Sequence, residues 1–152
     1  MRISTLPSGL TTAAVDLWKT CGLTRPWNDP DADLTRAMVG PSSTVLAAIA
    51  DEQLLGTVMV GHDGHRGWVY YLAVQAGRRN MGLGRTLMMA AESWLEQQGM
   101  PKVQLMVRSD NDAVIGFYEQ LGYVDQGVVV LGRFLDQDMQ ALREQEQHDD
   151  AP

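Results

Sequence analysis

Cysteine and long apolar runs are scarce in this sequence. Among its 152 residues there is one cysteine, Cys21, which excludes an internal disulfide. The stretch MRISTLPSGL at residues 1–10 lacks the apolar core of a signal peptide, and no apolar run reaches the length that spans a bilayer. These absences predict a cytoplasmic protein with no membrane partner.

Positive charge is also in deficit, with 12 Lys and Arg against 19 Asp and Glu and a formal net charge of -7. Nucleic acids and anionic membranes are bound by basic surfaces that release counterions, so we expect neither partner. With 45% hydrophobic residues, the chain can bury one core. We predict one domain over residues 1–135 and a polar, frayed tail over residues 136–152.

Apolar segments separated by turn residues predict the fold class. Residues 43–50 and 54–61 are typical of a hairpin, with a third strand over residues 68–74 after the turn at Asp63 and Gly64. Further strands are predicted over residues 1–6, 102–107 and 123–134, and helices over residues 10–22, 30–39, 82–99 and 111–122. Hairpins precede one strand-helix-strand unit, which indicates an α+β fold: a single mixed, mostly antiparallel sheet flanked by helices.

One stretch, VQAGRRNMGLGRTLMMAAESW over residues 74–94, combines glycines and arginines where a strand passes into a helix. Unpaired N–H groups at the positive end of that helix can hold an anion, and Gly82 and Gly84 leave space beside them. Three arginines add positive charge: Arg78, Arg79 and Arg85. A diphosphate is therefore the expected ligand.

Two other phosphate motifs fit this stretch poorly. Leu83 and Gly84 stand where a P-loop needs Lys and Ser or Thr, and Leu87 stands at the third glycine of a dinucleotide motif. From the residues alone, an explanation without a ligand stays open. The glycines would then only allow the helix to pack closely on the sheet.

Two motifs resemble those of the GNAT superfamily of acyl-CoA-dependent N-acyltransferases. RNMGLG at residues 79–84 matches the family signature Arg/Gln-x-x-Gly-x-Gly/Ala, although Asn80 and Met81 replace a common glycine and a common basic residue. NDAVIGFYEQLGY at residues 111–123 is similar to the second signature, and the two follow in the family's order. The segments RPWNDPDAD, GHDGHRG and YYLAV look most like the YpeA-like bacterial subgroup.

The resemblance implies a GNAT-type fold with a strand-loop-helix site for acetyl-CoA. Tyr118 occupies the position of the family tyrosine that protonates the leaving thiolate, and Asn111 that of a residue bonding the pantetheine arm. From the residues alone, Tyr118 could be a core residue and Asn111 a helix cap. The cofactor-binding residues that the resemblance implies are Leu72, Ala73, Val74, Arg79, Asn80, Met81, Gly82, Leu83, Gly84, Arg85, Asn111 and Tyr118.

The general base stays open. Many family members carry a glutamate on the strand that corresponds to residues 68–74, but WVYYLAV contains no carboxylate. The candidates for the base are Asp29, Asp31, Asp63, His65 and a water chain ordered by Tyr70 and Tyr71. His62 and His65 lack a third ligand at a suitable spacing, so no metal is predicted.

The expected acceptor is an amine on a small molecule or peptide, acetylated by direct transfer in a ternary complex. Acceptor residues implied by the resemblance are Trp27, Asn28, Asp29, Tyr70 and Tyr71. Aromatic and acidic groups suit an ammonium. A homodimer stays open, as does a non-catalytic acyl-CoA-binding regulatory module, which the missing strand carboxylate favours.

Overall fold

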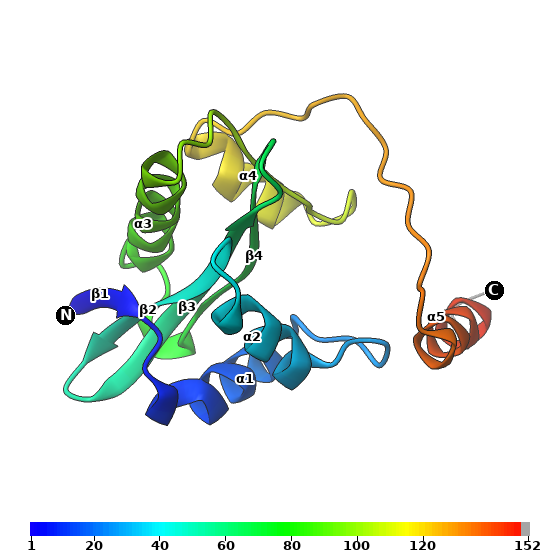
Figure 1. Cartoon of the computed structure of the whole chain (residues 1–152), viewed down its shortest axis with the longest axis horizontal. Coiled ribbons are helices and arrows are strands. Elements are labelled where there is room, and N and C mark those ends of the chain that lie inside the picture. Colours follow the sequence, from blue (N-terminus) through cyan, green and yellow to red (C-terminus); the bar gives the residue numbers. More distant parts are fainter. Residues whose placement is uncertain (150–152) are drawn as a thin grey trace. The chain divides into compact units, whose positions relative to one another are not determined.

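A computed structural model describes residues 1–149 of the chain (Figure 1). Its helices and strands alternate irregularly along the sequence. They are β1 (Arg2–Thr5), η1 (Ser8–Leu10), α1 (Thr11–Thr20), α2 (Pro30–Val39), β2 (Ser43–Ala50), β3 (Gln53–His62), β4 (Gly67–Val74), η2 (Ala76–Arg78), α3 (Leu83–Gln97), β5 (Val103–Leu105), α4 (Asp112–Gln120) and α5 (Gln137–Asp149).

The five strands form one sheet in the order β1-β2-β3-β4-β5. The first four strands pair antiparallel, and β5 runs parallel to β4. The predicted α+β class with a single mixed, mostly antiparallel sheet is confirmed. The β2–β3 hairpin closes through two residues with positive φ, Asp51 at 51° and Glu52 at 62°.

Helices cover both faces of the central strands, which explains why β2 and β3 read as continuous apolar runs (Figure 1). Val45, Ala47 and Ile49 of β2 join one core cluster with α1 and α2. The alternate β2 residues point to the opposite face, where α3 contacts β2, β3 and β4. This second contact is close: a Cβ added at Gly67 would lie 2.5 Å from Leu95 Cδ1 of α3.

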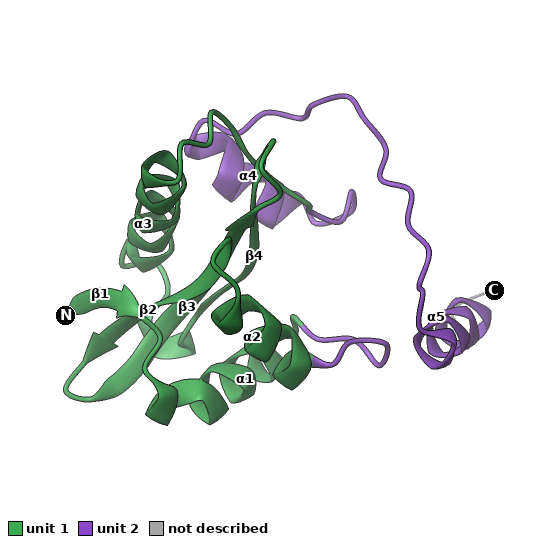
Figure 2. Ribbon diagram, in the orientation of Figure 1, with its two compact units in different colours: residues 1–23, 30–106 green, residues 24–29, 107–152 purple. Residues whose placement is uncertain are grey.

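The chain divides into two compact units, coloured separately in Figure 2. Unit 1 comprises residues 1–23 and 30–106 and contains the whole sheet with α1, α2 and α3. Unit 2 comprises residues 24–29 and 107–152 and contains α4 and α5. All buried residues of the described chain belong to unit 1.

The predicted strand over residues 123–134 is wrong. Within the described part of the chain, residues 123–136 form neither helix nor strand. Val128, Val129 and Leu131 are 71%, 83% and 90% exposed. β-branched residues favour a strand only where the edge of a sheet is available for pairing and a core is available for packing. No described strand pairs with this segment.

Two further elements differ from their predicted bounds. The strand expected over residues 102–107 shortens to β5, which pairs with β4 over three residues. Helix α5 occupies residues for which a frayed tail was predicted. The helix is capped, since Asp136 Oδ1 accepts from the N–H groups of Asp138 and Met139 at 2.9 and 3.1 Å. The last residues of the predicted tail, 150–152, lie outside the described residues.

Within residues 1–149, no helix combines the length and the apolar composition needed to cross a bilayer.

Candidate functional site

Strand β4 contains a bulge at Tyr71 and Leu72. These two residues together lie opposite a single residue of β3, Val58. Tyr71 has a φ of 51°, in the left-handed region that a tyrosine rarely adopts. A bulge redirects the side chain it carries, so the hydroxyl of Tyr71 reaches helix α2 and donates to Asp33 Oδ2 at 2.7 Å.

Buried groups from two other elements hold this bulge. Trp18 Nε1 of α1 donates to Thr57 Oγ1 at 2.8 Å, and Thr57 Oγ1 donates to the Tyr71 carbonyl at 3.1 Å. The Trp18 and Tyr71 rings stack with centroids 4.0 Å apart and an interplanar angle of 12°. Trp18 and Thr57 have no exposed surface, so the uncommon backbone at Tyr71 is fixed from within the core.

The junction between β4 and α3 has the features of an anion site. Residues 75–82 are exposed, and Gly82 precedes the helix with a φ of 77°. No side chain of the described part of the chain caps this end of α3. The first backbone bond runs from Thr86 N to Gly82 O at 3.0 Å, so in the described chain three earlier amides have no backbone acceptor: those of Leu83, Gly84 and Arg85.

Positive charge at this junction is not neutralised by ion pairs. In residues 1–149, no carboxylate lies within 4.0 Å of the guanidinium groups of Arg78, Arg79 or Arg85. Arg79 Nη2 instead lies 3.6 Å from Cys21 Sγ, and the thiol of Cys21 lies 3.6 Å from the Val74 carbonyl. The end of α1 therefore contacts both the last residue of β4 and the arginine loop.

On unit 2, Asn111 precedes α4 and Tyr118 lies on it. Asn111 caps the helix, because its Oδ1 accepts from Val114 N at 3.3 Å. The Tyr118 ring makes edge contacts with Phe117 and Tyr123, at centroid separations of 5.0 and 5.7 Å. Burial raises the pKa of Tyr118 to about 12, so its hydroxyl stays protonated at neutral pH.

The loop of residues 24–29 also belongs to unit 2. Asn28 Oδ1 accepts from Arg25 N at 2.9 Å and Asn28 N donates to Arg25 O at 2.8 Å, so Asn28 closes a turn. The guanidinium carbon of Arg143, from α5, lies 4.7 Å above the centre of the Trp27 ring. Asp29 is exposed beside them.

A model of the acetyltransferase (GNAT) family matches residues 12–123. The chain belongs to this family. The match includes the strand-loop-helix junction of unit 1 and the α4 motif of unit 2, so it covers both motifs that the sequence singled out.

Known proteins similar to this GNAT chain include curated relatives and solved structures. It is 44% identical over 126 residues to Acetyltransferase ECA0875 of Pectobacterium atrosepticum, which spans 83% of this chain and 89% of that protein. A transcriptional regulator from Bacillus halodurans has a TM-score of 0.76 at 17% identity, covering 88% of this chain and 99% of that one. The aminoglycoside acetyltransferase AAC(6')-Iy, in complex with a CoA bisubstrate analogue, has a TM-score of 0.75 at 16% identity, covering 89% and 98%. These two structures show the shared fold.

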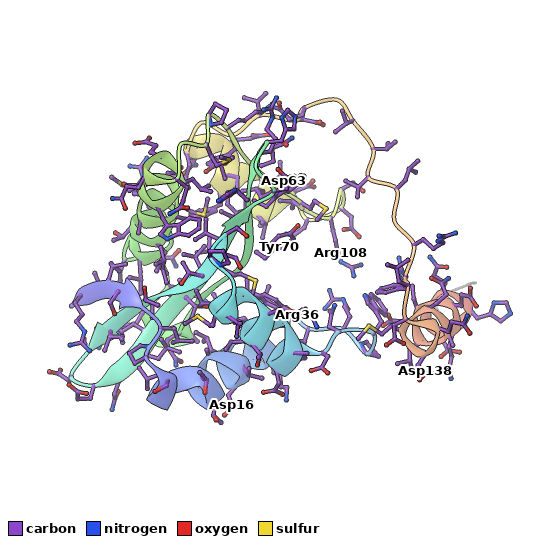
Figure 3. All side chains as sticks on the ribbon, viewed as in Figure 1. Asp16, Arg36, Asp63, Tyr70, Arg108 and Asp138 are labelled. Atoms are coloured by element: carbon purple, nitrogen blue, oxygen red, sulfur yellow. The ribbon has the colours of Figure 1, made fainter. Side chains whose placement is uncertain are left out.

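The residues predicted for the GNAT site form two sets, one on each unit. On unit 1, Leu72, Ala73 and Val74 end β4 and lead through the exposed loop to the residues from Arg79 to Arg85. Tyr70 and Tyr71 precede them on the same strand, and Tyr70 is 43% exposed (Figure 3). On unit 2 are Trp27, Asn28, Asp29, Asn111 and Tyr118.

The β3–β4 turn contains a carboxylate that is poorly suited to accept a proton. Asp63 Oδ1 accepts from the backbone N–H groups of Arg66 at 2.7 Å and His65 at 2.9 Å, and these bonds lower the pKa of Asp63 to about 2. Burial, and secondarily the charge of Asp63, raise the pKa of Tyr70. In residues 1–149, no three His, Cys, Asp or Glu side chains gather as metal ligands would.

Sequence reasoning did not single out Asp33. Asp33 and Tyr71 are 38 positions apart in the sequence, and their contact depends on the bulge. The order of apolar and polar residues in WVYYLAV does not indicate where that bulge lies. Trp18 and Thr57 were likewise expected only as helix and strand residues. The one feature of the sequence that could have directed attention to a carboxylate on another element was the absence of a carboxylate from β4.

Proposed function

We propose that this chain transfers an acetyl group from acetyl-CoA directly to a primary amine within a ternary complex. The observation that carries this proposal is the β4–α3 junction, where open amides follow the left-handed Gly82 beside three arginines that have no ion-pair partner among residues 1–149. A pyrophosphate fits that combination of dipole, backbone donors and positive charge. Membership of the acetyltransferase family supports CoA as the source of the pyrophosphate.

In this proposal each predicted cofactor residue has a defined contact. Leu72, Ala73 and Val74 pair with the pantetheine arm through their backbone, and Asn111 bonds the same arm. Arg79, Asn80, Met81, Gly82, Leu83, Gly84 and Arg85 surround the pyrophosphate. The exposure of residues 75–82 and the two left-handed residues, Asn80 at 65° and Gly82 at 77°, support this assignment.

The chemistry requires a neutral amine, whose nitrogen attacks the thioester carbonyl and displaces the CoA sulfur as the C–S bond breaks. The leaving thiolate takes a proton from the Tyr118 hydroxyl, which regains one from solvent. A tyrosine with its pKa raised to about 12 is protonated at neutral pH, so the proton to be donated is present. The amine proton leaves to water in this scheme, because β4 carries no carboxylate.

The acceptor is an amine on a small molecule or peptide, bound by Trp27, Asn28, Asp29, Tyr70 and Tyr71. A solved relative of this fold was captured with an acetylneamine analogue, which supports an amine as the acceptor class.

We further propose that residues 1–135 act as one cytoplasmic GNAT domain and that the chain belongs with the YpeA-like subgroup. The family match, which covers residues 12–123, supports the single domain.

The cofactor assignment is tested by Gly84→Glu. A carboxylate in the first turn of α3 is favourable to the helix, so folding should be retained. The same carboxylate would repel a pyrophosphate and weaken CoA binding on the order of 10- to 100-fold, measured by calorimetry. Met89→Glu is the matched control, because it adds the same charge at a 61% exposed position of the same helix. Equal CoA affinity in the two folded variants would refute the assignment.

Turnover is tested by following CoA release over a panel of amines. Tyr118→Phe keeps the ring and should lower kcat by about 10²- to 10⁴-fold, the usual contribution of a general acid, with CoA affinity unchanged. If wild-type protein binds CoA but no amine in the panel causes CoA to be released from acetyl-CoA, the non-catalytic acyl-CoA-binding module replaces the enzyme as the proposed function.

A further inference from the structure

A buried hydroxyl on β3 connects helix α1 with the bulge of β4. Thr57 Oγ1 accepts from Trp18 Nε1 at 2.8 Å and donates to the Tyr71 carbonyl at 3.1 Å. Chemistry fixes both directions, because an indole N–H can only donate and a carbonyl oxygen can only accept. Thr57 and Trp18 have no exposed surface, so water does not compete for these bonds. All three residues belong to unit 1.

The bond to the Tyr71 carbonyl also sets the direction of the next N–H group, that of Leu72. The carbonyl and the N–H of one trans peptide lie in a plane and point in opposite directions. Because the hydroxyl of Thr57 holds the Tyr71 carbonyl, the Leu72 N–H points away from that hydroxyl. A rotation of this peptide would therefore break the bond to Thr57.

The pairing of β4 shows which edge the Leu72 N–H faces. Gln75 N donates to Leu55 O of β3 at 2.8 Å, and successive N–H groups of a strand alternate between its two edges. Leu72 lies three positions earlier, so its N–H faces the edge opposite β3. In the described chain β5 pairs with that edge only as far as Val69, so no β5 residue lies opposite Leu72. In the proposed function this is the edge that pairs with the acyl-CoA arm.

We propose that Thr57, supported by Trp18, is a positioning residue that directs the Leu72 N–H at the carbonyl oxygen of the acyl thioester. This inference rests on the proposed function and deepens it by naming the buried groups that hold the reacting backbone in place. Neither Thr57 nor Trp18 touches the substrate. Both act through the Tyr71 carbonyl.

The N–H group directed in this way acts on charge that develops during transfer. When the amine nitrogen bonds to the acyl carbon, the C=O π pair moves onto oxygen, and the Leu72 N–H stabilises the negative charge there. When that pair returns, the C–S bond breaks. The thiolate takes its proton from Tyr118, and the amine proton passes to water, as in the proposed function.

The bulge needs such support because its backbone is unfavourable. A φ of 51° is uncommon for a tyrosine, and backbone of this kind persists only where its surroundings hold it. Thr57→Val keeps the branched shape but cannot donate, so the Tyr71–Leu72 peptide loses the bond that fixes its rotation. Thr57→Ser keeps the hydroxyl and should keep the peptide in place.

The direct test measures the direction of the Leu72 N–H by residual dipolar couplings in NMR of the unliganded protein. Thr57→Val should change the Leu72 coupling, whereas Thr57→Ser should retain the wild-type value. Trp18→Phe keeps an aromatic ring beside Tyr71 but has no N–H, and it should give a smaller change. An unchanged coupling in folded Thr57→Val overturns the proposal. If Thr57→Val does not fold, an unchanged coupling in Trp18→Phe overturns it.

Turnover separates a positioning role from a structural one. With an acceptor from the CoA-release panel, Thr57→Val should lower kcat about 10- to 100-fold with KM for acetyl-CoA within about twofold, because a misdirected donor affects mainly the transition state. Thr57→Ser should keep kcat within about threefold. Both variants alter buried atoms, so a merely structural role would affect both alike, and equal kcat values in the two overturn the proposal.

Thr44→Val is the matched control. Thr44 is a second buried threonine of the sheet, on β2 opposite Val60, and it does not contact the bulge. Removing its hydroxyl should leave kcat within about twofold and the Leu72 coupling unchanged. A loss of kcat in Thr44→Val as large as that in Thr57→Val would mean that any buried hydroxyl of the sheet has this effect, and the assignment to Thr57 would fail.

A comparison of acetyl-CoA with CoA separates this inference from the proposed function. Only the thioester offers a carbonyl acceptor, so acetyl-CoA should move the Leu72 amide proton downfield relative to CoA, and Thr57→Val should remove that difference. If wild-type protein binds both ligands without the difference, this inference fails and the proposed CoA site stands. If it binds neither, the proposed function fails, and the Leu72 couplings still decide whether Thr57 directs this N–H.

Discussion

Units 1 and 2 are ordered by different interactions. In unit 1, side chains such as Trp18, Leu87 and Met88 have at most 1% of their surface exposed, and helices pack on both faces of a sheet. Unit 2 has no buried residue among those described, and its order comes from helix caps, aromatic edges and the Arg143–Trp27 contact. Rigid backbone geometry is therefore expected in unit 1, because a packed core fixes a backbone more firmly than local hydrogen bonds do.

The functional residues divide in the same way. The β4 bulge and the start of α3 use backbone geometry, and both lie on the unit with the core. In the proposed function, Asn111 and Tyr118 act through side chains on the unit without one. Sites that depend on backbone amides at exact positions need the rigid support that unit 1 supplies.

The largest expected effect contrasts one leucine from each unit. Leu87→Ala removes a side chain with 0% exposure and should lower the free energy of unfolding by about 2–5 kcal/mol. Leu131→Ala removes one that is 90% exposed and should change it by less than about 0.5 kcal/mol. Urea unfolding measures both. Similar losses would mean that Leu131 is buried in solution and would end the contrast between the units.

A smaller effect should appear at alkaline pH and originate in unit 2. The pKa of Tyr118 is raised by burial from 10.0 to about 12, so the folded state favours the protonated hydroxyl. The resulting stability is complete below pH 10 and is lost as the pH rises towards 12. After allowance for partial exposure we expect a loss of roughly 1–2 kcal/mol.

Tyr118→Phe has no hydroxyl to ionise there and should lose less stability between pH 10 and pH 12 than wild-type protein. Tyr70 titrates in both proteins and contributes equally to each curve. Thermal melts across this range make the comparison, and identical curves would show that the Tyr118 hydroxyl is fully solvated in the folded protein.

The smallest expected effect on stability concerns the β2–β3 turn of unit 1. Asp51 and Glu52 form a two-residue hairpin turn with φ of 51° and 62°, a conformation that an Asn-Gly pair adopts with less strain. The double substitution Asp51→Asn with Glu52→Gly should stabilise the protein by about 1 kcal/mol. A melting temperature that falls instead would contradict the turn geometry. CoA affinity, measured alongside, should not change.

The same contrast explains which parts of the structure could be predicted. Apolar periodicity predicts the hairpin of β2 and β3 and the helix α3, because the positions that face a core are apolar and recur with the period of the strand or helix. The segment VVVL at residues 128–131 carries a strand-like composition, but composition does not specify a partner edge. Periodicity therefore succeeded for the core elements, and also for the helix predicted over residues 111–122, which is present as α4, whereas composition failed for residues 128–131.

The candidate site divides along a similar line. RNMGLG is contiguous, so its residues could be assigned from the sequence, and the structure adds the open amides and the left-handed Gly82. The Tyr71–Asp33 contact joins a strand to a helix through a one-residue shift in register. Neither the shift nor the contact changes the pattern of residue types, and three-dimensional packing was needed to find them.

The tryptophans give each unit its own optical signal. Trp18 is enclosed in the core of unit 1, where an indole fluoresces at shorter wavelength than in water, while Trp27 of unit 2 lies beneath the guanidinium of Arg143. The chain has four tryptophans, so variants that keep Trp18 or Trp27 as their single tryptophan would report separately on the melting of each unit. The emission spectrum could thereby follow the loop of residues 24–29 in real time while an acceptor binds.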